Sequence, residues 1–150
     1  MKVLKFGGTS VGSIENIQNV KNIINDGEQK IVVLSAMSGT TNTLVTIAST
    51  IENKTPEEGV GIAKALQEKY HTVVDQLFNE ENLNIDVKNY VNGIFNFLID
   101  LTSENYSLDL ANKIVAQGEL LSTYMFNAYL KQEGLSAALL PALNFMRIDE

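Results

Sequence analysis

The chain has 150 residues, of which 45% are hydrophobic and 19% charged, a composition typical of a soluble globular protein with one domain. Its formal net charge of −7, with lysines scattered along the chain, argues against nucleic-acid binding as its main role. The chain contains no cysteine, which excludes disulfides and thiolate metal sites; it shows neither a signal core nor an apolar run of membrane-spanning length, so we expect a cytoplasmic protein with no membrane partner.

The first predicted element is a short strand that leads into a glycine-rich turn, K-F-G-G-T-S-V-G, at residues 5–12. Glycines let the backbone approach a ligand closely and make positive φ cheap. The N–H groups of such a turn can bind an anion, and a helix N-terminus behind them adds to this attraction. Lys5 adds a positive charge, and Thr9 and Ser10 add hydroxyl donors. These are the parts needed to hold a polyphosphate. In a Walker P-loop the lysine follows the glycines, and G-x-G-x-x-G is absent here, so this is a phosphate loop of another kind.

A helix and a second strand are predicted next. Apolar residues recur at helical spacing from Ile14 to Ile24, and Ser13 is placed to cap this helix. The unbroken apolar run at residues 31–34 is typical of a strand buried in a parallel sheet. Strand, helix and strand within 35 residues predict a right-handed βαβ unit.

The second predicted strand ends in another hydroxyl-rich loop, S-A-M-S-G-T-T-N, at residues 35–42, ahead of a third helical stretch. Ligands of open parallel sheets bind outside the carboxyl ends of the strands, and two parallel strands put both loops on the same edge. Such loops often only cap helices, but the position of this one beside the first loop favours a role in ligand binding.

Residues 55–103 are predicted to be a helical insertion, because two amphipathic stripes are separated by a polar stretch. A further helix is expected from about Leu108, interrupted or kinked near Gly118. A glycine inside a helix costs about 1 kcal/mol relative to alanine and usually has a packing or functional reason. Most glutamates lie on wetted surfaces, but Glu119 has apolar neighbours and so sits beside a buried stripe. Residues 136–140 are expected to form a third buried strand.

Three stretches resemble aspartate kinases, which are members of the amino-acid kinase family. They are the octet at 5–12, the S-G-T-T-N run within 35–42, and G-E-L-L-S at 118–122. The resemblance runs the whole length of the chain, with the helical region 55–103 unspecific. It implies an α/β fold with three layers, α/β/α, and a mainly parallel sheet. Of this amino-acid kinase (carbamate kinase-like) fold the chain would supply the N-terminal half of the catalytic domain, without a regulatory domain.

The resemblance implies a reaction, the ATP-dependent phosphorylation of L-aspartate to 4-phospho-L-aspartate with Mg²⁺, the first step towards lysine, threonine and methionine. Positioning and charge neutralisation are the main needs of phosphoryl transfer. By motif match, the catalytic Lys5 would bind the nucleotide phosphates together with the neighbouring turn residues Gly7, Gly8, Thr9 and Ser10. Ser38, Thr41 and Glu119 would contact aspartate, and no residue is assigned as a metal ligand.

The chain departs from this family in length. The second half of the family's catalytic domain supplies adenine binding, an arginine for the substrate carboxylate and an aspartate near the transferred phosphate. Arg147, the only arginine here, does not match that role. The isolated chain is therefore expected to be inactive. The alternatives are another amino-acid kinase, acting on glutamate or acetylglutamate, and a non-catalytic module that binds anions or aspartate.

A sheet cut after about three strands leaves an exposed edge, which association usually covers. We therefore expect the chain to form a homo-oligomer, as a dimer or by exchange of elements. Light scattering at micromolar concentration would show at least twice the monomer mass; a clean monomer would contradict this expectation.

Overall fold

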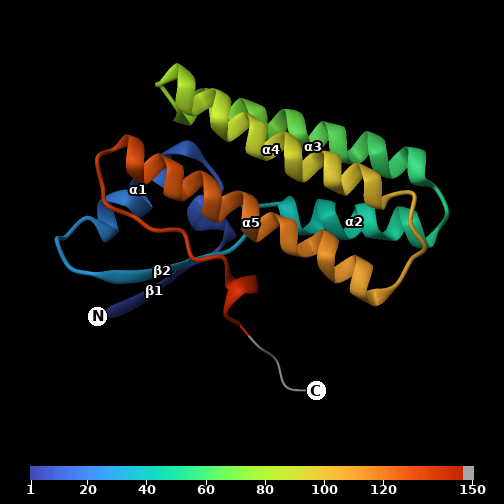
Figure 1. The fold of residues 1–150 in the computed structure, drawn as a ribbon, viewed down its shortest axis with the longest axis horizontal. Coiled ribbons are helices and arrows are strands. Elements are labelled where there is room, and N and C mark those ends of the chain that lie inside the picture. Colours follow the sequence, from blue (N-terminus) through green and yellow to red (C-terminus); the bar gives the residue numbers. More distant parts are fainter. Residues whose placement is uncertain (147–150) are drawn as a thin grey trace.

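The structure, a computed structural model, describes residues 1–146 and shows a small parallel sheet at one end of a set of long helices (Figure 1). Arg147 lies outside the described residues. Along the described part of the chain the elements are β1 (Lys2–Phe6), η1 (Gly8–Val11), α1 (Ile14–Ile24), β2 (Lys30–Leu34), α2 (Thr40–Glu52), α3 (Pro56–Leu77), α4 (Glu81–Leu101), α5 (Leu108–Gln132) and η2 (Ala142–Asn144). Here η1 and η2 are short 3₁₀ turns.

The βαβ unit expected at the start of the chain is present. Strands β1 and β2 pair in parallel with Lys2 opposite Lys30 and Phe6 opposite Leu34. The crossover helix α1 begins where expected, because the Ser13 hydroxyl accepts a hydrogen bond of 3.2 Å from the Asn16 N–H. This register puts the carboxyl ends of both strands, and the loops that follow them, side by side.

The two faces of the sheet differ in burial. Phe6, Val32 and Leu34 point to the helical side and contact the main core. On the opposite face Val3 is 64% exposed and Val33 44% exposed, so β-branched side chains face outwards there. Parallel sheets are usually covered on both faces, and the described residues cover one.

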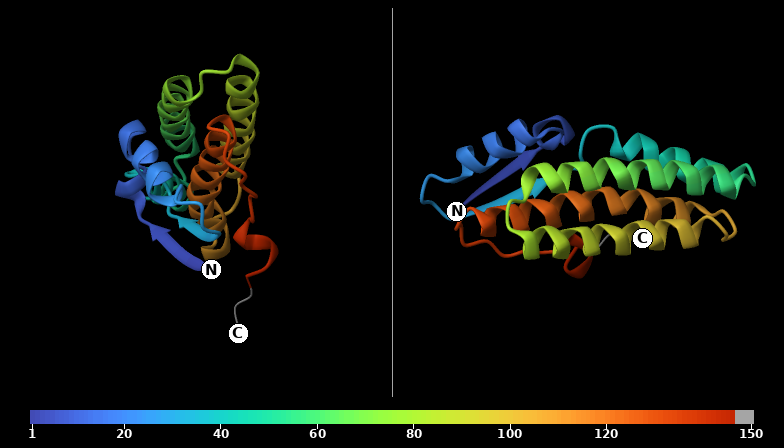
Figure 2. Two further views of the ribbon diagram at one scale, coloured as in Figure 1. Left: turned by 90° about the vertical axis from the view of Figure 1, so that its left-hand side faces the viewer. Right: turned by 90° about the horizontal axis from the view of Figure 1, so that it is seen from above.

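Helices α2 to α5 form a four-helix bundle. α3 packs against α2 and α4, and α5 packs against the same two helices, so each helix has two neighbours (Figures 1 and 2). The hairpin of α3 and α4 buries Tyr70 and Phe95 completely, with their rings tilted at 56° and centroids 5.8 Å apart. None of the helices in the described part of the chain has the length and apolarity needed to cross a membrane.

Helix α5 runs without interruption from Leu108 to Gln132, so the expected break near Gly118 is wrong. Its C-terminus is closed by Gly134, whose φ of +75° requires glycine or a strained residue. The Gly134 N–H donates to the Lys131 carbonyl at 3.0 Å and the Leu135 N–H to the Leu130 carbonyl at 2.9 Å. These two bonds make up a Schellman motif, which satisfies the last carbonyls of the helix.

The third strand expected at residues 136–140 is also wrong. The sheet in the described part of the chain contains β1 and β2 alone, and residues 136–140 have no ladder partner. Leu135 and Ala137 pack against the core while Ser136 and Ala138 are exposed, so burial alternates along this segment as it would in a strand. A strand needs a hydrogen-bonded neighbour as well as this pattern, and no neighbour is available here.

A contact between α2 and α3 gives a stability prediction. A Cβ on Gly59 in α3 would clash with the hydroxyl of Thr50, which is buried and donates to the Ile47 carbonyl at 2.7 Å. We expect Gly59→Ala to lower the free energy of unfolding by about 1–3 kcal/mol, the usual range for an overpacked core. Urea denaturation would measure this.

Gly61→Ala is the matched control, since Gly61 lies in the same helix, is exposed and has nothing within 4 Å of its Cβ position. It should raise the free energy of unfolding by roughly 0.5–1 kcal/mol through helix propensity alone. Equal changes in the two variants would contradict the packing argument.

Candidate functional site

The loops that follow β1 and β2 are joined to each other by backbone hydrogen bonds. The Ser35 N–H donates to the Phe6 carbonyl and the Ser38 N–H to the Gly8 carbonyl, both at 3.1 Å. We call residues 5–12 the phosphate loop and residues 35–42 the acceptor loop, after the roles expected from the sequence. The structure places both on the same edge of the sheet, in direct contact.

Close approach explains two of the three glycines of the phosphate loop, Gly8 and Gly12. Gly7 and Gly12 have φ values of −78° and −84°, and Gly8 is not among the residues with positive φ, so conformational freedom is not what this turn requires. A Cβ on Gly8 would lie 2.7 Å from the Ala36 carbonyl oxygen, and one on Gly12 would lie 2.9 Å from the Ser38 Cβ. A side chain at either position would push the loops apart.

The phosphate loop presents Lys5 and Thr9 to solvent. The Lys5 ammonium lies 4.0 Å from the Cβ position of Gly7, so it folds over the turn. Residues 8–11 form the 3₁₀ turn η1, and the first N–H groups of a helical turn have no partner inside it. Ser10 differs, because its N–H donates to the Gly7 carbonyl at 3.0 Å; its hydroxyl is the group left for a ligand.

The acceptor loop turns into α2 through Gly39, the N-cap residue, whose φ is +82°. Ser38 and Thr41 are exposed on either side of this turn, as candidate binding residues must be. Thr40, which lies between them in the sequence, is fully buried. Because Gly39 has no side chain, no side-chain cap covers the first turn of α2.

Helix α5 meets the acceptor loop through the G-E-L-L-S stretch. A Cβ on Gly118 would lie 2.7 Å from the Ala36 Cβ, so glycine is required for this contact. The Glu119 Oε1 accepts from the Ala36 N–H at 3.4 Å, and the Ser122 hydroxyl donates to the Ser35 carbonyl at 2.8 Å. Glycine, glutamate and serine of this stretch therefore all touch one loop, which explains a glycine inside an unbroken helix.

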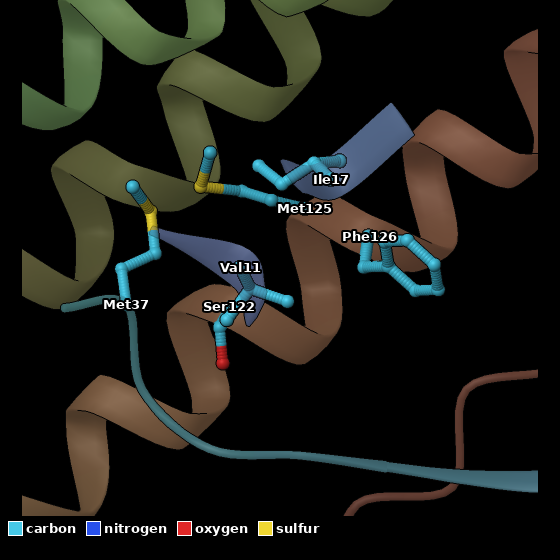
Figure 3. Close-up of a pocket in the computed structure, with 6 residues that line it drawn as sticks. All are labelled: Val11, Ile17, Met37, Ser122, Met125 and Phe126. Atoms are coloured by element: carbon cyan, nitrogen blue, oxygen red, sulfur yellow. The ribbon is translucent and has the colours of Figure 1, made fainter. Parts of the chain in front are cut away.

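A small cavity lies behind the two loops (Figure 3). Its volume is about 10 Å³, which is room for one water molecule and no substrate. Apart from the Ser122 hydroxyl its lining is apolar, from Val11, Ile17, Met37, Ser122, Met125 and Phe126. A substrate bound by these loops would therefore have to lie outside this cavity.

Two residues at the acceptor loop were missed by the sequence analysis, and both lie in α3. The Lys69 ammonium donates to the Ser38 carbonyl at 3.2 Å, and the Tyr70 hydroxyl shares a hydrogen bond of 2.9 Å with the Thr40 hydroxyl. Tyr70 lies on one of the two amphipathic stripes predicted for residues 55–103, and a stripe alone gives it no polar role. Its hydroxyl was the available signal, because a buried tyrosine hydroxyl usually finds a polar partner.

Burial is the main cause that raises the pKa of Tyr70 to about 12. The hydrogen bond with Thr40 opposes this rise in pKa, and the negative charge of Glu119 adds to it. The phenol is therefore protonated throughout the neutral range, and its hydrogen bond with Thr40 persists there.

A comparison with protein families decides the identity of the chain. The model of the amino acid kinase family matches residues 1–149. The chain belongs to the amino acid kinase family. Within this family its relatives are aspartate kinases, and it corresponds to their amino-terminal portion.

Among the curated relatives, lysine-sensitive aspartokinase 3 of Escherichia coli (strain K12) is 28% identical over 149 residues, which is 99% of this chain and 32% of the relative. Bifunctional aspartokinase/homoserine dehydrogenase 1, chloroplastic, of Arabidopsis thaliana is 30% identical over 151 residues, covering 93% of this chain and 16% of the relative. Aspartokinase of Geobacillus stearothermophilus is 54% identical over 55 residues, 34% of this chain and 14% of the relative.

Among solved structures, E. coli aspartokinase III in complex with lysine and aspartate superposes with a TM-score of 0.74 at 27% identity, over 91% of this chain and 30% of that one. The same enzyme in complex with aspartate and ADP gives a TM-score of 0.73 over 92% and 30%. The expected fold, the amino-terminal half of the amino-acid kinase fold, is confirmed. This member of the family spans about a third or less of the relatives it matches.

Titration of Tyr70 gives a prediction for alkaline pH. A raised pKa in the folded state stabilises the fold fully below the ordinary pKa of 10, and this contribution is lost as pH rises towards 12. A difference of about two pKa units between the folded and unfolded states corresponds to about 2–3 kcal/mol of stability. We expect the difference in free energy of unfolding between the wild type and Tyr70→Phe to fall by that amount from pH 10 to 12, in urea titrations.

Tyr106→Phe removes an exposed phenol. The difference in free energy of unfolding between this variant and the wild type should stay constant across this pH range. If Tyr70→Phe behaves in the same way, the Tyr70 hydroxyl contributes nothing to alkaline stability.

Proposed function

We propose that this chain carries the phosphate-binding and acceptor-binding loops of an ATP-dependent aspartate kinase, which forms 4-phospho-L-aspartate. One observation supports this most: the two loops are hydrogen-bonded to each other, with Lys5 exposed on one and Glu119 against the other. Phosphoryl transfer needs its donor and acceptor held in line a few ångströms apart, which two touching loops can provide.

The phosphate loop would hold the transferred end of ATP. The Lys5 ammonium would neutralise charge on the phosphates, and the N–H groups of Gly7, Gly8 and Thr9 would donate to their oxygens. The hydroxyls of Thr9 and Ser10 would add two further donors. Lys5 is given the catalytic role because it supplies a mobile full charge beside this turn.

The acceptor loop would hold aspartate. Ser38 and Thr41 are exposed residues that offer hydroxyls, and Glu119 offers a half-buried carboxylate. One carboxylate oxygen of Glu119 already accepts from the Ala36 N–H, so its carboxylate is held in place to accept from the substrate's ammonium group. The solved complexes of E. coli aspartokinase III with aspartate support this choice of acceptor.

Magnesium would accompany the nucleotide. In the described part of the chain no group of three or more histidine, aspartate or glutamate side chains could hold a metal ion. We infer that Mg²⁺ would be bound by the phosphates of ATP, where it would neutralise charge on the transferred group. The chain's own residues would then contact the phosphates rather than the metal.

The greater length of the relatives bears on whether this chain can catalyse the reaction by itself. We propose that these 150 residues bind ligands but need further protein for catalysis, since they match about a third or less of the relatives. Binding rather than activity is therefore the property to measure on this chain.

Calorimetric titration with L-aspartate and with Mg-ATP tests the assignments. We expect Lys5→Ala to weaken Mg-ATP and Glu119→Gln to weaken L-aspartate, each by roughly 10- to 100-fold, as expected when a charge-assisted hydrogen bond is lost. Each variant should leave the other ligand's affinity within about twofold of the wild type, since the two loops would bind different groups.

Lys131→Ala and Glu104→Gln are the charge-matched controls, because both side chains are exposed and lie outside the two loops. They should bind both ligands like the wild type. Tighter binding of L-glutamate than of L-aspartate would favour another amino-acid kinase. No heat with any ligand would mean that this chain alone forms no binding site.

A further inference from the structure

The acceptor loop is held at two points by two different helices. Helix α5 holds its beginning, through Glu119 on the Ala36 N–H and Ser122 on the Ser35 carbonyl. Helix α3 holds its end, through Lys69 on the Ser38 carbonyl and Tyr70 on the Thr40 hydroxyl. The G-E-L-L-S stretch of α5 is part of the resemblance to aspartate kinases, whereas α3 belongs to the region that the sequence analysis found unspecific.

The Tyr70–Thr40 hydrogen bond is rigidly placed. Both residues have no exposed surface, and the Tyr70 ring packs against Phe95 of α4. Thr40 is the first residue of α2, and its methyl group lies 3.3 Å from the Cβ position of Gly118. Thr40 is thus fixed from α3 on one side and from α5 on the other, and it precedes the exposed Thr41.

Lys69 precedes Tyr70 in α3 and reaches the other side of the same turn. Its ammonium lies 3.2 Å from the Ser38 oxygen and 3.9 Å from the Cβ position of Gly39. Within the described residues no carboxylate lies within 4.0 Å of this ammonium, so the Ser38 carbonyl is its protein partner. A lysine without an acidic partner, bound to the backbone of a left-handed turn, is well placed to fix that turn.

We propose that Lys69 and Tyr70 are positioning residues, through which the α3–α4 hairpin holds Ser38 and Thr41 in the geometry that binds the acceptor. The proposal rests on the proposed function for the identity of the acceptor. The claim about the loop itself does not depend on any ligand. It gives the helical hairpin a part in the site beyond packing.

A ligand-free measurement tests the loop directly. Hydrogen exchange by NMR would follow the backbone N–H groups of residues 36–43 in the wild type and in Tyr70→Phe, which keeps the ring and loses the hydroxyl. We expect exchange in this segment to be faster by about tenfold, as for the loss of one buried hydrogen bond, with α4 unchanged. Tyr129→Phe is the control, since Tyr129 is a buried tyrosine of α5 outside the loop contacts.

Aspartate affinity tests the consequence for binding, in a double-mutant cycle. Tyr70→Phe and Thr40→Val should each raise the Kd for L-aspartate by roughly 3- to 10-fold, and the double variant should be no weaker than the poorer single variant. Lys69→Met should also raise the Kd, and Lys69→Arg, which keeps the donor, should restore most of the affinity. Lys64→Met, on the same helix with an exposed side chain, should have no effect.

The outcomes separate the two proposals. Unchanged exchange at residues 36–43 in Tyr70→Phe, or additive effects in the cycle, would overturn the positioning role. Equal losses in Lys69→Met and Lys69→Arg would overturn the role of Lys69. If the wild type binds no aspartate, the proposed function fails for this chain, and the exchange measurement still decides whether α3 holds the loop.

Discussion

The arrangement of this protein depends on the close backbone contact between its two loops. The Ser38 N–H reaches the Gly8 carbonyl because neither Gly8 nor Gly12 carries a side chain that would keep the loops apart. The parallel register of β1 and β2 brings the loops together, and Gly118 lets α5 approach from behind. Two glycines of the phosphate loop and one distant glycine in α5 thus serve one purpose, which is to let backbone and helix meet without a Cβ between them.

Local signals in the sequence were enough for much of the fold. The apolar periods predicted β1, α1, β2 and the helical hairpin, and Ser13 and Gly134 mark helix ends as their chemistry requires. The positions of the two loops followed from the parallel sheet, since both strands must end on one edge. Glu119 lies beside the acceptor loop, whereas its apolar neighbours predicted only a position beside a buried stripe. What the site residues bind stays a prediction.

The features that the sequence did not predict all depend on tertiary partners. Residues 136–140 have the period of a strand but pair with no strand in the part of the chain that the structure describes, and Gly118 lets an unbroken α5 contact Ala36. The roles of Lys69 and Tyr70 cannot be predicted from an amphipathic pattern. Helical periodicity shows on which face of the helix a residue lies, but not which atom it will contact. Hydrogen bonds between distant segments require the fold to be known first.

The bonds that hold the acceptor loop to α5 join residues 83 and 87 positions apart, whereas the α3–α4 hairpin pairs neighbouring segments. Bringing distant segments together costs more chain entropy than closing a hairpin, and that entropy is lost before the contacts can compensate for it. Order of assembly follows from this difference. We expect the hairpin to form early from local contacts, and the acceptor loop to reach its final position when α5 docks, so that the site is completed late in folding.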